Sequence, residues 1–142
     1  MQVKQVSPRE VQDWIKDIAT QILLSGKKYD YIVGIEKGGL FLSKPLSELL
    51  CLPHKSVRIS FYEHGMAPAL DPIVESNGYV YQPNGLLVDD LIDEGRTIRK
   101  FVDLFGKLDV AVLLWNFGAY VEEPKYYGGL KPKEWVVFPW EQ

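Results

Sequence analysis

The chain has 142 residues, of which 46% are hydrophobic and 25% charged, and its net charge at pH 7 is −3. This length suffices for one domain that buries roughly 70% of the surface of the unfolded chain. A slightly acidic chain without a Lys/Arg cluster is not expected to bind nucleic acid. The single Cys51 excludes an internal disulfide, and the sequence contains no signal peptide or membrane span. We therefore expect one domain over residues 1–142, located in the cytoplasm.

The first predicted element is an amphipathic helix that begins at Pro8 and ends near Gly26. Ser7 is suited to cap this helix, and Glu10 completes a capping box. Apolar residues recur at helical spacing along it, at Val11, Trp14, Ile15, Ile18 and Ile22. A structural role accounts for the whole segment.

A strand over residues 31–35 is followed by a glycine turn and a second, apolar helix over residues 40–50. The turn contains Lys37, Gly38 and Gly39. Paired glycines expose backbone N–H groups and the lysine adds a positive charge, which together suit a diphosphate. Taken alone, such a turn is more often a solvated surface feature, so its interpretation depends on the acidic stretch described below.

Residues 55–62 alternate as a strand, and residues 63–82 have no helical periodicity. A loop of that length inside a small domain often acts as a lid. Arg58 and Tyr62 are candidates for the site that such a lid would close. We interpret the two histidines as structural or solvated rather than catalytic: His54 and His64.

The most informative stretch covers residues 85–98. An apolar run typical of a buried strand turns acidic at Asp89 and Asp90, passes Gly95 and enters a helical pattern at Thr97. The two carboxylates suit ribose hydroxyls or Mg²⁺, and the helix N-terminus suits a phosphate. Acidic residues at a helix start are common, but three Asp and one Glu within six residues repel one another unless a cation is present. A phosphate site beside a diol and metal site describes a sugar phosphate.

Three further segments complete the chain. Residues 110–115 predict a buried strand, residues 116–129 a polar excursion, and residues 135–141 an aromatic edge strand with Phe138 in the core. The repeated strand–turn–helix units predict a parallel α/β sheet with both turns at its carboxyl edge.

Residues 86–98 resemble the binding motif for phosphoribosyl diphosphate (PRPP) of type I phosphoribosyltransferases. The resemblance implies a single-domain parallel sheet flanked by helices, with a small hood from the terminal segments. It implies that Asp89 and Asp90 hold the ribose, directly or through Mg²⁺, and that Asp93 is the catalytic acid or base near the attacking nitrogen. The implied 5′-phosphate loop consists of Asp93, Glu94, Gly95, Arg96 and Thr97.

The first glycine turn resembles the pyrophosphate loop of the same family, which often contains a cis non-proline peptide. The resemblance implies that diphosphate is bound by Glu36, Lys37, Gly38 and Arg58. The chain end resembles the ending of purine phosphoribosyltransferases of the xanthine-guanine and hypoxanthine type. There Trp135 would stack on the base, Val136 would read the base edge through its backbone, and Glu141 would lie near a second metal.

These purine enzymes usually carry a lysine shortly after the preceding strand, where it contacts the 6-oxo group. This chain has Asn116 in that stretch. The asparagine amide could donate a neutral hydrogen bond to the base or accept one from a 6-amino group. Both alternatives are open at the level of sequence.

The sequence thus predicts an enzyme that transfers the phosphoribosyl group from PRPP to a nucleobase, preferably a purine. We expect the enzyme to use Mg²⁺ as cofactor and to form a homo-oligomer. One alternative is a non-catalytic domain that senses PRPP or a nucleotide. Another is transfer to a pyrimidine or other acceptor. A Rossmann-type oxidoreductase is not expected, because no Gly-x-Gly-x-x-Gly follows the first strand.

Overall fold

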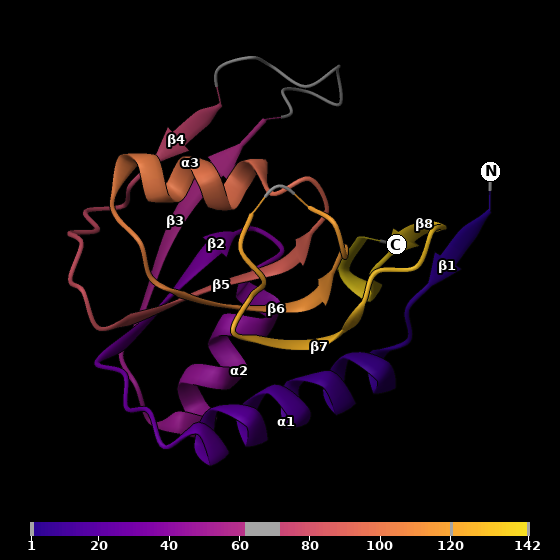
Figure 1. Cartoon of the computed structure of the whole chain (residues 1–142), viewed down its shortest axis with the longest axis horizontal. Helices are drawn as coiled ribbons and strands as arrows, with labels where there is room; N and C mark the ends of the chain where they lie inside the picture. Colours follow the sequence, from indigo (N-terminus) through magenta and orange to yellow (C-terminus); the bar gives the residue numbers. More distant parts are fainter. Residues whose placement is uncertain (1, 62–71, 120, 142) are drawn as a thin grey trace.

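The computed structural model describes residues 2–61, 72–119 and 121–141. A six-stranded sheet lies between helices on both faces (Figure 1). Helices α1 (Pro8–Ser25) and α2 (Leu40–Leu50) cover one face, and α3 (Arg96–Leu104) covers the other. The predicted α/β class is therefore confirmed. Within the described ranges, no helix is long and apolar enough to cross a membrane.

The order of the strands places the candidate site. It is β4-β3-β2-β5-β6-β7, and every neighbouring pair is parallel except β3 with β4. The chain moves from β2 outward to β3 and then returns to place β5 on the other side of β2. Ligands of such sheets bind where the direction of winding reverses, outside the carboxyl ends of the strands. The strands are β2 (Tyr31–Glu36), β3 (His54–Ser60), β4 (Ile73–Glu75), β5 (Gly85–Ile92), β6 (Asp109–Trp115) and β7 (Tyr126–Leu130).

The two terminal segments form a separate sheet. Strand β1 (Val3–Gln5) pairs in parallel with β8 (Trp135–Val137), and a 3-10 turn, η1 (Pro139–Glu141), follows. Figure 1 shows this pair at one side of the main sheet, in agreement with the predicted hood.

The sheet is buried on both faces, as expected for parallel strands linked by helices. In β5 the side chains of Leu86 and Val88 face the α1 and α2 core, whereas Leu87 faces the α3 core. All three are 0% exposed. This alternation explains why the strand reads as a continuous apolar run.

Helix α1 follows its sequence signals closely. The Ser7 hydroxyl accepts a hydrogen bond from the Glu10 N–H (3.1 Å), and the Glu10 carboxylate accepts one from the Ser7 N–H (3.1 Å). Gly26 ends the helix in the left-handed conformation, with φ 71°. The predicted capping box and helix end are confirmed.

Three boundaries predicted from the sequence were wrong. Strand β5 does not end at Val88 but continues to Ile92, because β6 supplies backbone partners along that whole length. The segment 116–129 is not all excursion, since β7 begins at Tyr126, whose ring is 2% exposed. The predicted edge strand over 135–141 stops at Val137, because Pro139 has no N–H to continue a ladder.

The segment predicted as a lid is only partly described. Strand β4 (Ile73–Glu75) lies in it, which the sequence did not predict, and pairs antiparallel with β3. Tyr62 and His64 lie outside the described residues.

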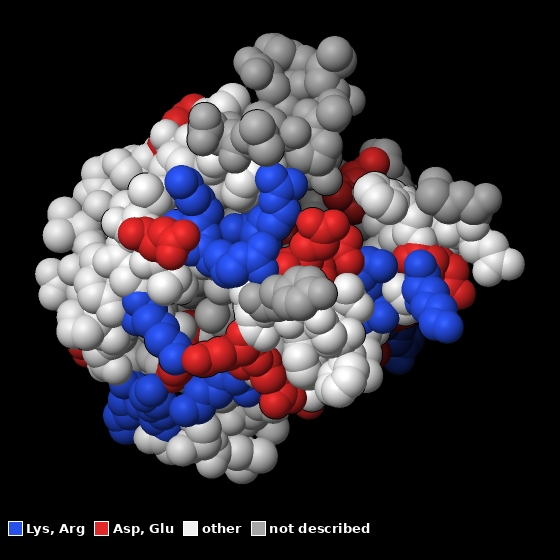
Figure 2. All heavy atoms as spheres, turned by 45° about the horizontal axis from the view of Figure 1, so that its top comes forward, with Lys and Arg blue, Asp and Glu red and all other residues white. Residues whose placement is uncertain are grey.

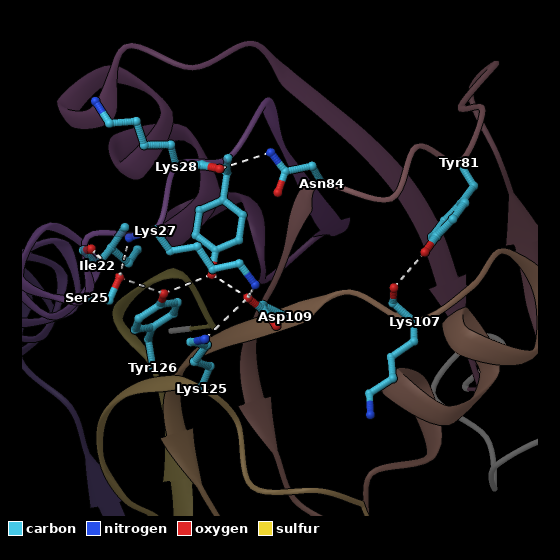
Figure 3. Close-up of polar contacts among 11 residues, drawn as sticks. Ile22, Ser25, Lys27, Lys28, Tyr81, Asn84, Lys107, Asp109, Lys125 and Tyr126 are labelled. Atoms are coloured by element: carbon cyan, nitrogen blue, oxygen red, sulfur yellow. Dashed lines mark hydrogen bonds and ion pairs between the residues drawn. The ribbon is translucent and has the colours of Figure 1, made fainter.

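A polar network at the amino edge of the sheet, away from the candidate site, ties β6 to its neighbours (Figure 3). The Asp109 carboxylate accepts hydrogen bonds from Tyr29 (2.6 Å) and Lys27 (2.5 Å), and Tyr29 also pairs with Tyr126 (2.8 Å). Partial burial would raise the pKa of Asp109, but these donors hold it below its ordinary value. The network fixes the starts of β6 and β7 against the α1–β2 connection.

Candidate functional site

The turn after β2 meets the acidic end of β5 at the reversal point of the sheet. The Glu36–Lys37 peptide is cis. A Cβ added to Gly38 would overlap the Asp90 carboxylate, and one added to Gly39 would lie 2.8 Å from the Val88 carbonyl oxygen. Only glycines allow the turn to approach β5 this closely. The residues predicted to bind diphosphate therefore lie directly against those predicted to bind ribose.

Asp89 and Asp90 form a tightly coupled acidic pair. Burial, followed by the charge of Asp90, raises the pKa of Asp89 well above its ordinary value. Burial also raises the pKa of Asp90, and the Glu141 carboxylate adds to this effect. Glu141, from the last turn of the chain and predicted to lie near a second metal, is thus within electrostatic reach of Asp90. A bound cation would relieve the repulsion among these groups.

The donor chemistry of these residues fits Mg²⁺, which prefers carboxylate oxygens and keeps several other ligands. In the described part of the chain, however, no group of three or more His, Cys, Asp or Glu side chains could hold a metal ion. One Glu141 oxygen also accepts a hydrogen bond from the Phe138 N–H (2.9 Å). The carboxylates therefore fit an ion that takes most of its ligands from substrate and water.

Gly95 shapes the loop between β5 and α3. It caps α3 with φ 83°, a conformation that favours glycine, and a Cβ there would lie 2.5 Å from Val121 Cγ1. The loop surrounds a cavity of about 160 Å³ lined by Phe61 and residues 91–98. Backbone N–H groups at a helix start bind anions, so this loop is suited to a phosphate. All the residues predicted for the 5′-phosphate line this cavity, namely Asp93, Glu94, Gly95, Arg96 and Thr97.

Arg96 contributes a contact that the sequence did not predict. Its guanidinium lies 4.3 Å from the centre of the Phe61 ring. Phe61 directly follows β3, so the contact joins the end of β3 to the start of α3. Figure 2 shows basic side chains gathered in this region beside a group of acidic side chains.

The side chains beside the first turn are held by the β3–β4 region. The Glu36 carboxylate accepts a hydrogen bond from Asn77 (2.7 Å), and Arg58 forms an ion pair with Glu75 (4.0 Å). Arg58 lies opposite Glu36 in the β2–β3 register, while Lys37 is exposed. The sequence missed Asn77, although the pair Asn77-Gly78 is a recognisable turn signal.

Asp93 and Asn116 lie together at the ends of two adjacent strands. The Asn116 amide nitrogen donates to the Asp93 carbonyl oxygen (3.0 Å) and to its carboxylate Oδ1 (3.3 Å). The Asn116 backbone N–H donates to the Ile92 carbonyl (2.8 Å). The residue predicted to contact the base is thus bonded to the predicted acid/base.

Trp135 and Val136 lie on β8 in the terminal sheet. The Trp135 side chain is 59% exposed, which leaves its ring available to stack on a ligand. The backbone groups of Trp135 and Val137 bond to the residues on either side of β1. The Trp135 N–H donates to the Gln2 carbonyl (3.1 Å), and the Val137 carbonyl accepts from the Val6 N–H (2.9 Å). Because backbone groups alternate in direction along a strand, those of Val136 point away from β1.

A larger cavity lies elsewhere, between α3 and the β6–β7 connection. It has a volume of about 690 Å³, and its lining includes the ion pair of Lys107 with Glu122 (2.8 Å). It shares Ile98 and Arg99 with α3 but contains neither the acidic pair nor the glycine turn. Size alone therefore does not identify the site.

Comparison with known proteins agrees with this geometry. The family described as the phosphoribosyl transferase domain matches residues 3–142. Orotate phosphoribosyltransferase of Caenorhabditis elegans is 30% identical over 96 residues, covering 66% of this chain and 39% of that protein. The chain thus spans about two fifths of the length of that curated relative.

Solved structures extend the similarity to the whole chain. A purine phosphoribosyltransferase from Pyrococcus horikoshii is 27% identical with a TM-score of 0.80, covering 100% of this chain and 95% of that one. The xanthine-guanine-hypoxanthine phosphoribosyltransferase of Helicobacter pylori has the same fold, with a TM-score of 0.79 at 18% identity over 99% of this chain and 94% of that one. The glycine turn, the acidic pair and the helix-start loop therefore occur in a chain that belongs to the phosphoribosyltransferase family.

Proposed function

We propose that this chain transfers the 5-phosphoribosyl group of PRPP to a nucleobase, preferably a purine, and releases diphosphate. The observation that carries the proposal is the contact between Gly38 and Asp90. It brings a turn suited to diphosphate against carboxylates suited to ribose hydroxyls, at the point where ligands of such sheets bind. The loop at Gly95 then offers a site for the 5′-phosphate at the end of the same strand.

The roles of the residues follow from this arrangement. Backbone groups of Lys37 and Gly38, with the positive charges of Lys37 and Arg58, would bind diphosphate, and Glu36 would shape the turn. Asp89 and Asp90 would hold the ribose hydroxyls. The N–H groups of residues 93–97 would hold the 5′-phosphate, which supports binding of PRPP by both of its ends.

Mg²⁺ fits the same residues. Asp89 and Asp90 would hold one ion together with oxygens of PRPP, since the protein supplies few of its ligands, and Glu141 would lie near a second ion. When bound, the ion would supply positive charge that stabilises the departing diphosphate.

The chemical step needs one proton acceptor. The five-membered ring of a purine has two nitrogens, and one of them carries a proton. The lone pair of the other nitrogen forms the bond to the anomeric carbon of PRPP. The bond from that carbon to diphosphate breaks, and its electron pair leaves with diphosphate. The Asp93 carboxylate would take the ring proton and later release it to water. Lys37 and the amides of its turn would stabilise the charge that develops on the leaving group.

Purine is the favoured acceptor for two reasons. The Pyrococcus horikoshii relative, a purine phosphoribosyltransferase by name, covers the whole chain. Trp135 also provides an exposed aromatic ring, and the backbone of Val136 points away from β1. The similarity to orotate phosphoribosyltransferase favours a pyrimidine acceptor as the second candidate.

The test is to mix the protein with PRPP, Mg²⁺ and each of a panel of purines and pyrimidines, and to measure diphosphate release. Release that depends on one purine supports the proposal, whereas release with orotate or uracil alone supports the second candidate. Binding of PRPP without release for any base would contradict catalysis and favour a sensor. Light scattering of the same sample tests the predicted homo-oligomer.

A further inference from the structure

The amide of Asn116 has a defined orientation. Its nitrogen lies 3.0 Å from the Asp93 carbonyl oxygen and 3.3 Å from the Asp93 carboxylate Oδ1. A backbone carbonyl only accepts hydrogen bonds, so the atom that faces it must be the NH₂ group and not the amide oxygen. The backbone bond from Asn116 to Ile92 holds the residue in this place.

This orientation fixes what Asn116 offers to a ligand. The amide NH₂ group donates to two oxygens of Asp93, the backbone carbonyl and the carboxylate Oδ1. The polar atom that remains is the carbonyl oxygen Oδ1, which can only accept. Asp93 and Asn116 line one cavity of about 310 Å³, together with Glu94, Arg96 and the 118–119 segment. A ligand that reaches Asp93 from this cavity therefore meets a hydrogen-bond acceptor on Asn116.

The proposed function places a purine at Asp93, and the next step rests on it. The ring nitrogen that gives up its proton is N7, and the substituent on C6 lies on the same edge of the ring, next to N7. A group hydrogen-bonded to Asp93 is therefore in position to meet the C6 substituent. We propose that Asn116 Oδ1 accepts a hydrogen bond from an exocyclic amino group there, so that the preferred acceptor is a 6-aminopurine.

The chemistry of the alternative is unfavourable. A 6-oxopurine presents an acceptor at C6, so its lone pairs would face those of Asn116 Oδ1. Turning the amide to offer NH₂ would remove both hydrogen bonds to Asp93 and direct the amide oxygen at the Asp93 carbonyl. A site whose remaining polar atom is an acceptor discriminates against ligands that leave this atom unpaired.

The decisive experiment compares three bases that differ in the substituent on C6: adenine with an amino group, purine with hydrogen, and hypoxanthine with an oxo group and a proton on N1. We expect kcat/KM to fall in that order, with adenine about 100-fold above hypoxanthine. A higher kcat/KM for hypoxanthine than for adenine would overturn the inference while leaving phosphoribosyl transfer intact. Transfer to pyrimidines alone would also overturn the inference about Asn116. If the protein transfers the phosphoribosyl group to none of the bases, both this inference and the proposed function are wrong.

Variants of Asn116 separate base reading from the positioning of Asp93. Asn116→Ala removes both, so we expect the adenine preference to shrink to less than about 10-fold and kcat to fall. Asn116→Asp keeps an acceptor but loses the donors to Asp93, so adenine preference should persist while kcat falls. A preference for adenine that survives in Asn116→Ala would contradict the role of Asn116.

Asn84→Ala is the matched control. Asn84 also donates its amide to a backbone carbonyl, that of Lys28 (2.9 Å), but at the opposite edge of the sheet (Figure 3). We expect this variant to keep the wild-type order of bases. Thermal unfolding of each variant checks that it is folded at the assay temperature.

Discussion

The backbone of Gly38 lies so close to the Asp90 carboxylate that no side chain fits between them. Gly38 belongs to the turn after β2, and Asp90 to the end of β5, 52 positions later in the chain. Their contact joins the two halves of the proposed PRPP site. It is also the feature that is simplest to disrupt by a single methyl group.

Gly38→Ala should weaken PRPP binding, because the new Cβ would displace Asp90 from its position. We expect the KM for PRPP to rise at least about 10-fold, since displaced groups near a reacting centre are costly. Steady-state kinetics with varied PRPP measure this effect. Gly129→Ala is the control, because a Cβ there lies an ordinary 3.5 Å from Leu114, and its KM should match wild type.

Asp93→Asn should lower kcat and spare PRPP binding. The asparagine keeps an oxygen for the bond from Asn116 but cannot take the ring proton, so we expect kcat to fall about 10²–10⁴-fold. Calorimetry should give a dissociation constant for PRPP close to that of wild type. Equal turnover in both proteins would remove Asp93 from the acid/base role.

Gly95→Ala should destabilise the loop for two reasons, its positive φ and its contact with Val121. The backbone conformation alone costs an alanine about 1–2 kcal/mol in the free energy of unfolding. Val121→Ala in the same chain should recover the steric part and leave the conformational part. Urea unfolding of the two single variants and the double variant measures both. A double variant no more stable than Gly95→Ala would show that Val121 does not restrict this position.

Asp109→Asn tests the amino-edge network by its dependence on pH. The folded-state pKa of Asp109 lies below its ordinary value of 3.8, so its ionised form stabilises the fold above that pH. This contribution is lost as the pH falls through the folded-state pKa. We expect the variant to unfold about 1 kcal/mol more easily at pH 7, with the difference shrinking as the pH falls below 3.8.

Urea unfolding at several pH values provides the measurement for this network. Asp13→Asn is the control, because Asp13 is an exposed residue on α1. A difference for Asp109→Asn that stays constant as the pH falls below 3.8, down to acid unfolding of the protein, would mean that the carboxylate charge does not stabilise the network.

Trp135→Ala should raise the KM for the base and leave the KM for PRPP unchanged. Stacking of a base on an aromatic side chain contributes about 1–3 kcal/mol, so we expect a rise between about 5-fold and 150-fold. Trp135→Phe keeps a ring and should lose less. Equal KM values for the base in Trp135→Ala and wild type would exclude stacking on this residue.

The sequence by itself determined the fold class and most of the helices and strands, and it predicted the class of ligand. Capping at Ser7, the apolar runs of β2 and β5 and the helical spacing of α1 depend on neighbours in the chain, so local patterns sufficed. Asp89, Asp90 and Gly95 could be predicted as site residues for the same reason, since the carboxylates and the helix start lie within one short stretch. The ends of β5 and β8 and the presence of β4 were missed, because their extent depends on partner strands far away in sequence.

Only the tertiary structure decided how these stretches meet. It showed that Gly38 touches Asp90, that Glu141 approaches the acidic pair, and that Val121 packs on Gly95. It also directed the Asn116 amide to Asp93, a choice between donor and acceptor that the sequence left open. The physical reason is that a hydrogen-bonding group commits its donors to whichever oxygens the fold brings within reach. The order of parallel strands, and not the spacing of residues, determines which oxygens those are.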